Sequence, residues 1–154
     1  MDIKRLNVNF GGTPSPGYQG GDAAFNDVAA LVHSALPSSY IDFIKEADGG
    51  HPEIGSFAPV GGDAGNLFDI DLFYSFGDSP GMNIKAALAR WGSILGQNAL
   101  PIGRDGGGNQ IYIDLTNGGQ SVWIFLHDEE NHRLKIANDF EAFIDLLQEN
   151  PDFI

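Results

Sequence analysis

One stretch of the sequence, residues 104–130, constrains the fold more than any other. In residues 111–115, Ile and Leu alternate with Tyr and Asp, which is the period of a strand with one buried face. Residues 122–126, which include Trp123, are almost wholly apolar and rich in β-forming side chains, so this run is predicted to be covered on both faces. Residues 117–119, Asn-Gly-Gly, tolerate the positive φ values that a tight reversal requires. The stretch therefore predicts a β-hairpin.

Two polar turns frame this hairpin. Residues 105–109 are Asp-Gly-Gly-Gly-Asn, and a strand follows the glycines where a phosphate cradle would need a helix. We therefore predict a tight connection in which Asp105 and Asn109 bond the backbone of their own loop. Residues 127–130 are His-Asp-Glu-Glu. Consecutive side chains diverge after a strand, so we predict a solvated turn there and no metal site.

Four helices are predicted from apolar side chains at three- and four-residue spacing. They begin near Asp22, Pro37, Asn83 and Asn138. Pro37 suits a first helical position, where its missing N–H costs nothing. Asn83 and Asn138 are predicted N-caps of their helices. Residues 49–50, both glycine, stop the second helix, and one of them is predicted to adopt a left-handed conformation.

The remaining extended segments complete a sheet. In residues 66–76, apolar side chains alternate with Asp69 and Asp71, which predicts a strand with one wet, acidic face. Residues 100–102 are predicted to lead into the hairpin, and residues 134–137 are predicted to form a short strand. This order of helices and strands predicts the α+β class, with an antiparallel or mixed sheet that packs against the helices.

The chain is predicted to divide into a short arm and one domain. Residues 1–21 are rich in glycine and proline, so we predict a loosely structured arm. Residues 6–10 alternate and predict a short edge strand, with Phe10 and Tyr18 packing the arm onto the rest. Residues 22–154 are predicted to form a single domain, as the length of the chain favours.

The charge balance of the 154 residues favours a protein partner. The chain has 21 acidic and 8 basic side chains, a formal charge of -13. Such a charge repels phosphate, which excludes direct nucleic-acid binding, and attracts a basic partner. The sequence contains no Cys, no apolar run of membrane-spanning length and no signal peptide, so we expect a cytoplasmic protein that binds no membrane. A hydrolase that uses acids near Asp105 and Asp128 stays open as an alternative.

Four segments, taken together, resemble the SUKH superfamily, the Smi–Knr cell-wall-regulator-like proteins. Residues 36–50 resemble its signature helix, which carries Leu-Pro, an aromatic residue and a final Asn/Asp-Gly-Gly. Residues 104–115 resemble its Asp-x-Gly-Gly-Asn motif and the strand that follows. Residues 122–130 and 136–147 resemble its next strand and its last helix. The residues of these motifs, which we expect to determine the fold, are Pro37, Tyr40, Gly49, Gly50, Asp105, Gly107, Gly108, Asn109, Trp123 and Phe140.

The resemblance implies an α+β domain with about four helices and no catalytic residues, metal or cofactor. It implies that bacterial members are immunity proteins, each of which binds and blocks a cognate toxin domain, often a nuclease. Fungal members are implied to be regulatory scaffolds that act through protein contacts, which is the alternative function. We expect a monomer or a weak homodimer. The acidic residues expected to contact a basic toxin are Asp69, Asp71, Asp128, Glu129 and Glu130.

Overall fold

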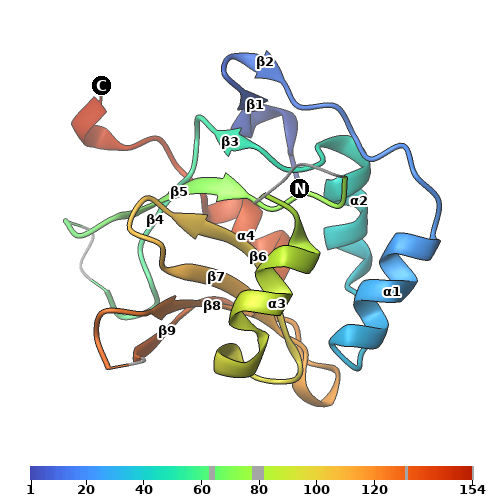
Figure 1. Ribbon diagram of the computed structural model, residues 1–154. Helices are drawn as coiled ribbons and strands as arrows, with labels where there is room; N and C mark the ends of the chain where they lie inside the picture. The colour runs from blue at the N-terminus through green and yellow to red at the C-terminus, as the bar shows by residue number, and fades with distance from the viewer. Residues whose placement is uncertain (63–64, 78–81, 131, 154) are drawn as a thin grey trace.

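The computed structural model describes residues 1–62, 65–77, 82–130 and 132–153 (Figure 1). Its centre is a six-stranded antiparallel sheet in the order β4-β5-β6-β7-β8-β9, beside a three-stranded sheet in the order β2-β1-β3. The strands are β1 (Val8–Phe10), β2 (Thr13–Pro14), β3 (His51–Pro52), β4 (Ser56–Phe57), β5 (Phe68–Phe73), β6 (Ala99–Asp105), β7 (Gln110–Asp114), β8 (Ser121–Leu126) and β9 (His132–Ala137). The α-helices are α1 (Ala23–Leu31), α2 (Ser38–Glu46), α3 (Ile84–Leu95) and α4 (Phe140–Leu146). The predicted α+β class is confirmed.

The predicted hairpin is confirmed as β7 and β8, with Tyr112 opposite Trp123. Sequence reasoning missed that β6 is a full strand of seven residues beside it. Proline and glycine interrupt the apolar pattern there, and the register shifts between Pro101 and Gly103. A Cβ on Gly103 would lie 2.6 Å from the Leu72 carbonyl oxygen, so the close approach of β5 requires glycine.

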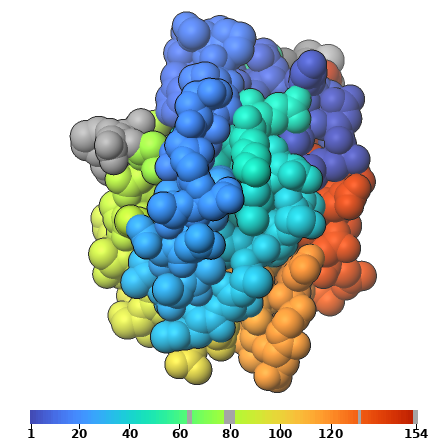
Figure 2. Space-filling view, turned by 90° about the vertical axis from the view of Figure 1, so that its right-hand side faces the viewer, coloured from blue at the N-terminus to red at the C-terminus, as the bar shows by residue number. Residues whose placement is uncertain are grey.

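The two faces of the sheet are covered by different helices. Figure 1 shows α3 in front of the sheet and α4 behind it. Behind the sheet, α2 and α4 bury the main core, in which Tyr40 and Phe43 both contact the ring of Phe140 at 5.3 Å between centroids. In Figure 2, the blue segment that contains α1 lies beside the cyan α2. In front, α3 covers a smaller cluster that includes Tyr112 and Phe125. Strand β8 is therefore covered on both faces, as predicted.

The helix caps correct one prediction. Asn83 accepts a hydrogen bond from the Ala86 N–H at 2.8 Å, so its predicted N-cap role is confirmed. The prediction for Asn138 was wrong, because Asp139 is the N-cap of α4 and accepts from Ala142 at 2.7 Å. Asp139 is extended, with φ -155°, which directs its carboxylate over the first turn.

The start of α2 also differs from its prediction. Pro37 precedes the helix, with φ -58° and ψ 136°, and Ser38 is the first helical residue. The extended ψ of Pro37 leads the chain into the helix and leaves the proline ring outside the first turn. Pro37 is therefore the N-cap residue rather than the first helical one.

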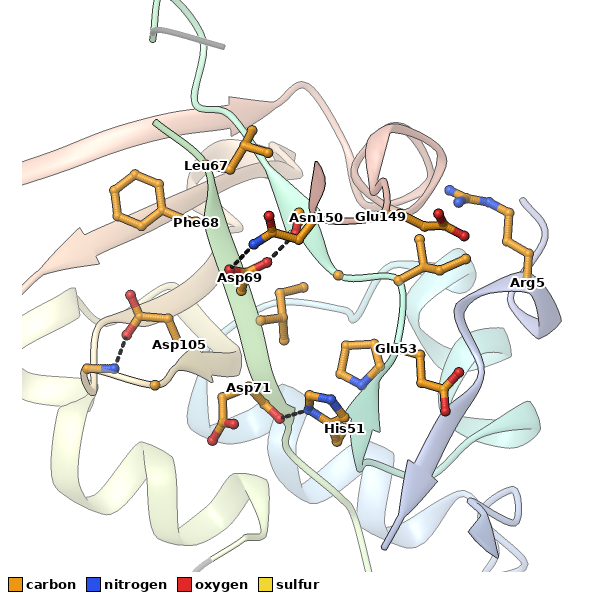
Figure 3. A pocket seen from close by; sticks show the side chains of 17 residues that line it. Arg5, His51, Glu53, Leu67, Phe68, Asp69, Asp71, Asp105, Glu149 and Asn150 are labelled. Carbon is orange, nitrogen blue, oxygen red and sulfur yellow. Dashed lines mark hydrogen bonds between the residues drawn. The ribbon is translucent and has the colours of Figure 1, made fainter. Parts of the chain in front are cut away.

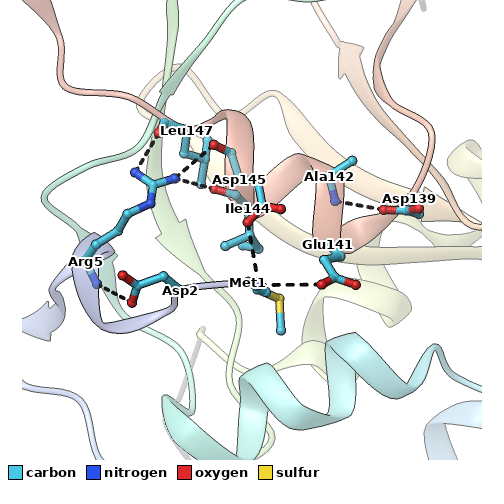
Figure 4. Close-up of polar contacts among 9 residues, drawn as sticks. All are labelled: Met1, Asp2, Arg5, Asp139, Glu141, Ala142, Ile144, Asp145 and Leu147. Atoms are coloured by element: carbon cyan, nitrogen blue, oxygen red, sulfur yellow. Dashed lines mark hydrogen bonds and ion pairs between the residues drawn. The ribbon is translucent and has the colours of Figure 1, made fainter.

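Two arginines from outside the helices cap α3 and α4. Neither helix has a basic residue suited to this role in its last turn. Arg133 of β9 donates to the Leu95 carbonyl at 2.7 Å, and Arg5 donates to the Leu147 carbonyl at 2.8 Å (Figure 4). Carbonyl groups at a helix C-terminus lack partners within the helix and carry partial negative charge. These contacts therefore fasten α3 to β9 and α4 to the N-terminal residues.

The Asp-Gly-Gly segment after α2 forms a junction. The Asp48 carboxylate accepts hydrogen bonds from the N–H groups of residues 76 and 77 at 2.6 and 3.0 Å. Gly49 has φ 80°, as predicted for one of the two glycines, and a Cβ there would lie 2.8 Å from the Ser75 Cβ. Gly50 has φ 125° and approaches the backbone of β1. The junction therefore holds β1, α2 and the segment after β5 together.

The N-terminal residues contribute to the core. Ile3, Leu6 and Val8 are buried, and the predicted short strand is confirmed as β1. Its predicted edge position was wrong, because β1 lies between β2 and β3 in the small sheet. Tyr18 packs on the ring of Phe25 as expected, but the prediction for Phe10 was wrong. Its side chain is 37% exposed, and Phe10 pairs with Thr13 of the exposed strand β2. The division of the chain after residue 21 stays a prediction.

Backbone groups outside the sheet cover both of its edge strands. Ser56 of β4 exchanges two backbone hydrogen bonds with Gln148, each 3.0 Å long. The N–H of Val60, in the loop after β4, donates to the Lys135 carbonyl of β9 at 2.7 Å. The loop after β4 therefore reaches from one edge of the sheet to the other, and the sheet is curved.

Candidate protein-binding surface

Three segments meet at one end of the main sheet, on the left of Figure 1. They are the first half of β5, the β6–β7 turn and the β8–β9 turn. The register brings them together, since Ile70 lies opposite Asp105, Arg104 opposite Gln110, and Gln110 opposite Phe125. We call this region the acidic end of the sheet, and it is the candidate surface.

The β6–β7 turn is built around the Asp105 carboxylate. One oxygen accepts from the N–H groups of Gly107 at 3.0 Å and Asn109 at 2.8 Å, and the other accepts from the Asn109 amide at 2.9 Å. Gly108 has φ 87°, which favours glycine at this position. The predicted role of Asp105 is confirmed, and its carboxylate is engaged in holding the turn. The prediction for Asn109 was wrong, because its side chain donates to the Asp105 carboxylate and accepts from the His127 N–H rather than bonding the backbone of its own loop.

The β8–β9 turn is fastened to the β6–β7 turn through His127. Its N–H donates to the Asn109 side chain at 3.1 Å, and its Nε2 lies 2.7 Å from the Gly107 carbonyl oxygen. Its Nδ1 lies 3.1 Å from the Asp128 carboxylate. The two turns therefore form one connected unit, which fixes the position of the acidic residues that follow.

An open groove of about 810 Å³ lies between β5, the segment from β3 to β4, and the β6–β7 turn (Figure 3). Its basic lining residues are Arg5 and His51, and Arg5 is engaged in capping α4. Asp69 accepts hydrogen bonds from the Ser56 hydroxyl and from Asn150. The five acidic residues that line the groove are Glu53, Asp69, Asp71, Asp105 and Glu149.

The predicted contact residues lie at this end of the sheet in two groups. Asp69 and Asp71 are exposed on β5, on either side of the buried Ile70, and line the groove. Residues 128–130 are exposed in the β8–β9 turn and do not line it. Sequence reasoning missed Glu53 and Glu149 of the groove, because only folding brings these distant parts of the chain to β5.

Comparison with known proteins identifies the family. The model of the SMI1 / KNR4 family (SUKH-1) matches residues 21–146, most of the chain. The chain belongs to the SUKH-1 family. A relative from Bacillus subtilis (strain 168), described as "SPbeta prophage-derived uncharacterized protein YokK", is 28% identical over 166 residues. That comparison covers 97% of this chain and 84% of the relative.

The other SUKH-1 motif residues lie in the core and in strand β8. Phe140 is fully buried among aromatic rings, and the Trp123 indole donates to the Ser121 hydroxyl at 2.9 Å. Tyr40 is fully buried, and its hydroxyl has no hydrogen-bond partner among the described residues. Burial raises the pKa of Tyr40, and the nearby Asp48 adds to the rise. Burial also raises the pKa of Asp48, and the hydrogen bonds that it accepts from two backbone N–H groups partly offset this rise.

The acidic residues of this SUKH-1 protein are dispersed rather than convergent. Within residues 1–62, 65–77, 82–130 and 132–153, no three His, Asp or Glu side chains are grouped in a way that would hold a metal ion. The acids of the groove face solvent along its walls, and Asp105 accepts three hydrogen bonds from its own turn. No helix in these residues is long and apolar enough to cross a membrane. The exposed carboxylates make this surface negatively charged.

Proposed function

We propose that this SUKH-1 protein is a non-catalytic immunity protein, which binds a cognate basic toxin domain through the acidic end of the sheet. One observation carries the proposal: the acidic groups at residues 69–71 and 128–130 lie at the same end of one sheet. They come from segments almost 60 positions apart and are brought together only by the fold. Immunity is a function implied by the resemblance to the SUKH superfamily.

Charge supports the proposal through the rate and selectivity of association. A formal charge of -13 attracts a basic domain from a distance, and complementary potentials speed encounter. A nuclease groove must be basic because it binds phosphate. An acidic protein seated on such a groove would exclude its substrate without any chemical step.

The rigidity of the turns supports the same proposal. The contact between His127 and Gly107 and the hydrogen bonds within the β6–β7 turn fix both loops before any partner binds. Association then loses less conformational entropy than it would with mobile loops. The two turns thus present the acidic residues in one ordered arrangement to a partner.

The experiment measures association with the product of the neighbouring gene, purified as an inactive toxin domain. One variant combines Asp69→Lys and Asp71→Lys, and a matched control carries Asp42→Lys and Glu46→Lys on the exposed face of α2. Both variants change the net charge equally. We expect the first to slow association by at least about tenfold at low salt, and the control to have a much smaller effect.

A second variant reverses the three acids of residues 128–130 and is expected to slow association in the same way. The proposed surface would be overturned if both acidic-end variants and the control variant associated with the partner at equal rates at every salt concentration. A bound partner with no toxic activity would instead support the regulatory scaffold. Turnover of a substrate by the purified chain, lost on Asp128→Asn, would support the hydrolase.

A further inference from the structure

A small pocket beside α3 contains two arginines and is separate from the acidic groove. Its volume is about 230 Å³. Arg104 and Asp105 are neighbours in β6, and strand geometry sends their side chains to opposite faces. Arg104 accordingly lines this pocket, while Asp105 lines the groove. The residues that line the pocket include Tyr74, Arg90, Trp91, Arg104, Gly108 and Gln110.

Neither guanidinium in the pocket is paired with an acid within the described part of the chain. The side-chain ion pair between a basic residue and an acid found there joins Lys85 to Asp27. Arg90 lies over the ring of Trp91, 5.4 Å from its centroid. Lys85 is the only Lys or Arg of the described residues that pairs with a side-chain carboxylate. Arg90 and Arg104 differ from the other unpaired cations in lining one pocket together, where their donors are available to a ligand.

The inner wall of the pocket is polar and ordered. The buried Tyr74 hydroxyl donates to the Gln110 side chain at 2.5 Å, and the Gln110 amide donates to the Gly108 carbonyl at 3.0 Å. Burial raises the pKa of Tyr74, and the charges of Arg104 and Arg90 oppose that rise. Both arginines line the pocket beside this wall.

We propose that this pocket binds one oxyanion group, a carboxylate or a phosphate. Guanidinium groups match the geometry of such anions and bind them through two parallel hydrogen bonds. The Tyr74 wall and the Trp91 ring limit the space to a single anionic group, since pockets for whole drug-sized ligands measure roughly 300 Å³ or more. The proposal does not depend on the function proposed above.

The experiment uses Trp91 as the reporter. The chain has two tryptophans, so a Trp123→Phe background leaves Trp91 as the only indole. Inorganic phosphate and N-acetylaspartate are titrated separately at constant ionic strength, with NaCl replacing the anion. We expect saturable quenching or a spectral shift with at least one anion, at dissociation constants on the order of millimolar.

Variants assign the response to the two arginines. Arg104→Gln and Arg90→Gln are each expected to weaken binding at least about tenfold. Lys85→Gln removes an equal charge from the exposed face of the same helix and is expected to change binding less than about twofold. Arg90 is exposed on α3, so its variant tests the site even if Arg104→Gln fails to fold.

The two titrations distinguish the source of the oxyanion. Stronger binding of phosphate indicates a phosphorylated ligand, and stronger binding of N-acetylaspartate indicates a carboxylate ligand or an acidic side chain. No saturable response to either anion would overturn the proposal. An equal loss of binding in Lys85→Gln would also overturn it, because the effect would then reflect net charge alone.

Discussion

Asp48 is a half-buried carboxylate at the junction between α2 and β5, and burial raises its pKa above the ordinary value of 3.8. A carboxyl group whose pKa is higher in the fold stabilises the fold when protonated. That stability is present below the pKa of the unfolded chain and is lost as pH rises through the folded pKa. We therefore expect the free energy of unfolding of the wild type, relative to Asp48→Asn, to decrease as pH rises from 3.8 towards neutrality.

Urea unfolding at a series of pH values measures this difference. Asp42→Asn, on the exposed face of the same helix, is the control for removing a carboxylate without burial. A difference between wild type and Asp48→Asn that stays constant or grows with pH would contradict the prediction. A constant offset in favour of the wild type is expected in addition, because asparagine has only one oxygen to accept the two N–H groups.

Tyr40 supplies a second test at the scale of a single residue. Its hydroxyl is fully buried and has no partner among the described residues, so it loses its hydrogen bonds to water on folding. Tyr40→Phe removes the hydroxyl and keeps the ring contacts with Phe76 and Phe140. We expect the free energy of unfolding to be unchanged or to rise by about 1 kcal/mol.

Thermal and urea unfolding measure the effect of Tyr40→Phe. A matched control is Tyr112→Phe, because the Tyr112 hydroxyl accepts a hydrogen bond from Arg133 at 3.1 Å. This control is expected to lower stability by roughly 1 kcal/mol. Loss of stability in Tyr40→Phe as large as in the control would show that the Tyr40 hydroxyl has a partner.

At the scale of the elements, the C-terminus of α3 depends on a cation from β9. Arg133→Ala removes hydrogen bonds to the carbonyls of Ile94 and Leu95, and also the contact of the guanidinium with the Phe125 ring at 5.3 Å. We expect the free energy of unfolding to fall by about 2 kcal/mol. Urea unfolding measures it, with Lys135→Ala of the same strand as the control for charge. Equal effects of the two substitutions would contradict the capping role.

The glycines of α3 give opposite predictions at two nearby positions. Gly92 lies inside the helix, and a Cβ there would meet no heavy atom within 4 Å. Gly92→Ala is expected to raise the free energy of unfolding by about 0.5–1 kcal/mol. Gly96→Ala is expected to lower it, because Gly96 ends the helix with φ 126°. Calorimetric melting temperatures of the two variants check the signs, and a destabilising Gly92→Ala would contradict the first.

Element periodicity explains which parts of the fold were predictable. The 104–130 stretch shows alternation on β7 and an apolar run on β8, so both strands could be placed from sequence. Strand β6 could not, because Pro101 and Gly103 are residues typical of loops. Here they stand where the register against β7 shifts, and Gly103 also permits the close approach of β5. The cap of α4 was misplaced by one residue, since Asn138 and Asp139 are both good caps and only the backbone decides between them.

At the scale of the whole molecule, the N-terminal residues test the predicted division of the chain. Ile3, Leu6 and Val8 are buried, and Arg5 caps α4. Deletion of residues 1–10 is therefore expected to lower the free energy of unfolding by on the order of 5 kcal/mol. Urea unfolding measures the loss, with Phe10→Ala as the control for a partly exposed side chain. Wild-type stability of the deleted chain would support a separable arm at residues 1–21.

The candidate surface was only partly accessible to sequence reasoning. Asp69 and Asp71 were identified because strand alternation makes their face wet, and residues 128–130 because they follow a strand. Their position at the same end of the sheet depends on the register of four strands, which one sequence does not encode locally. The pocket of Arg90 and Arg104 could not be predicted from the sequence for the same reason, because a helix and a strand form it together.

The covered edges of the main sheet decide how a partner can recognise it. Gln148 forms two backbone hydrogen bonds with Ser56 of β4, and the Val60 N–H donates to the Lys135 carbonyl of β9. An incoming peptide therefore finds no uninterrupted row of backbone donors and acceptors along either border, which hinders recognition by β-augmentation. The same two contacts oppose amyloid-like growth from these borders at high protein concentration. Recognition of the main sheet through its side chains is thereby favoured. Substitutions of those side chains can change the choice of partner without disturbing the backbone hydrogen bonds between the strands.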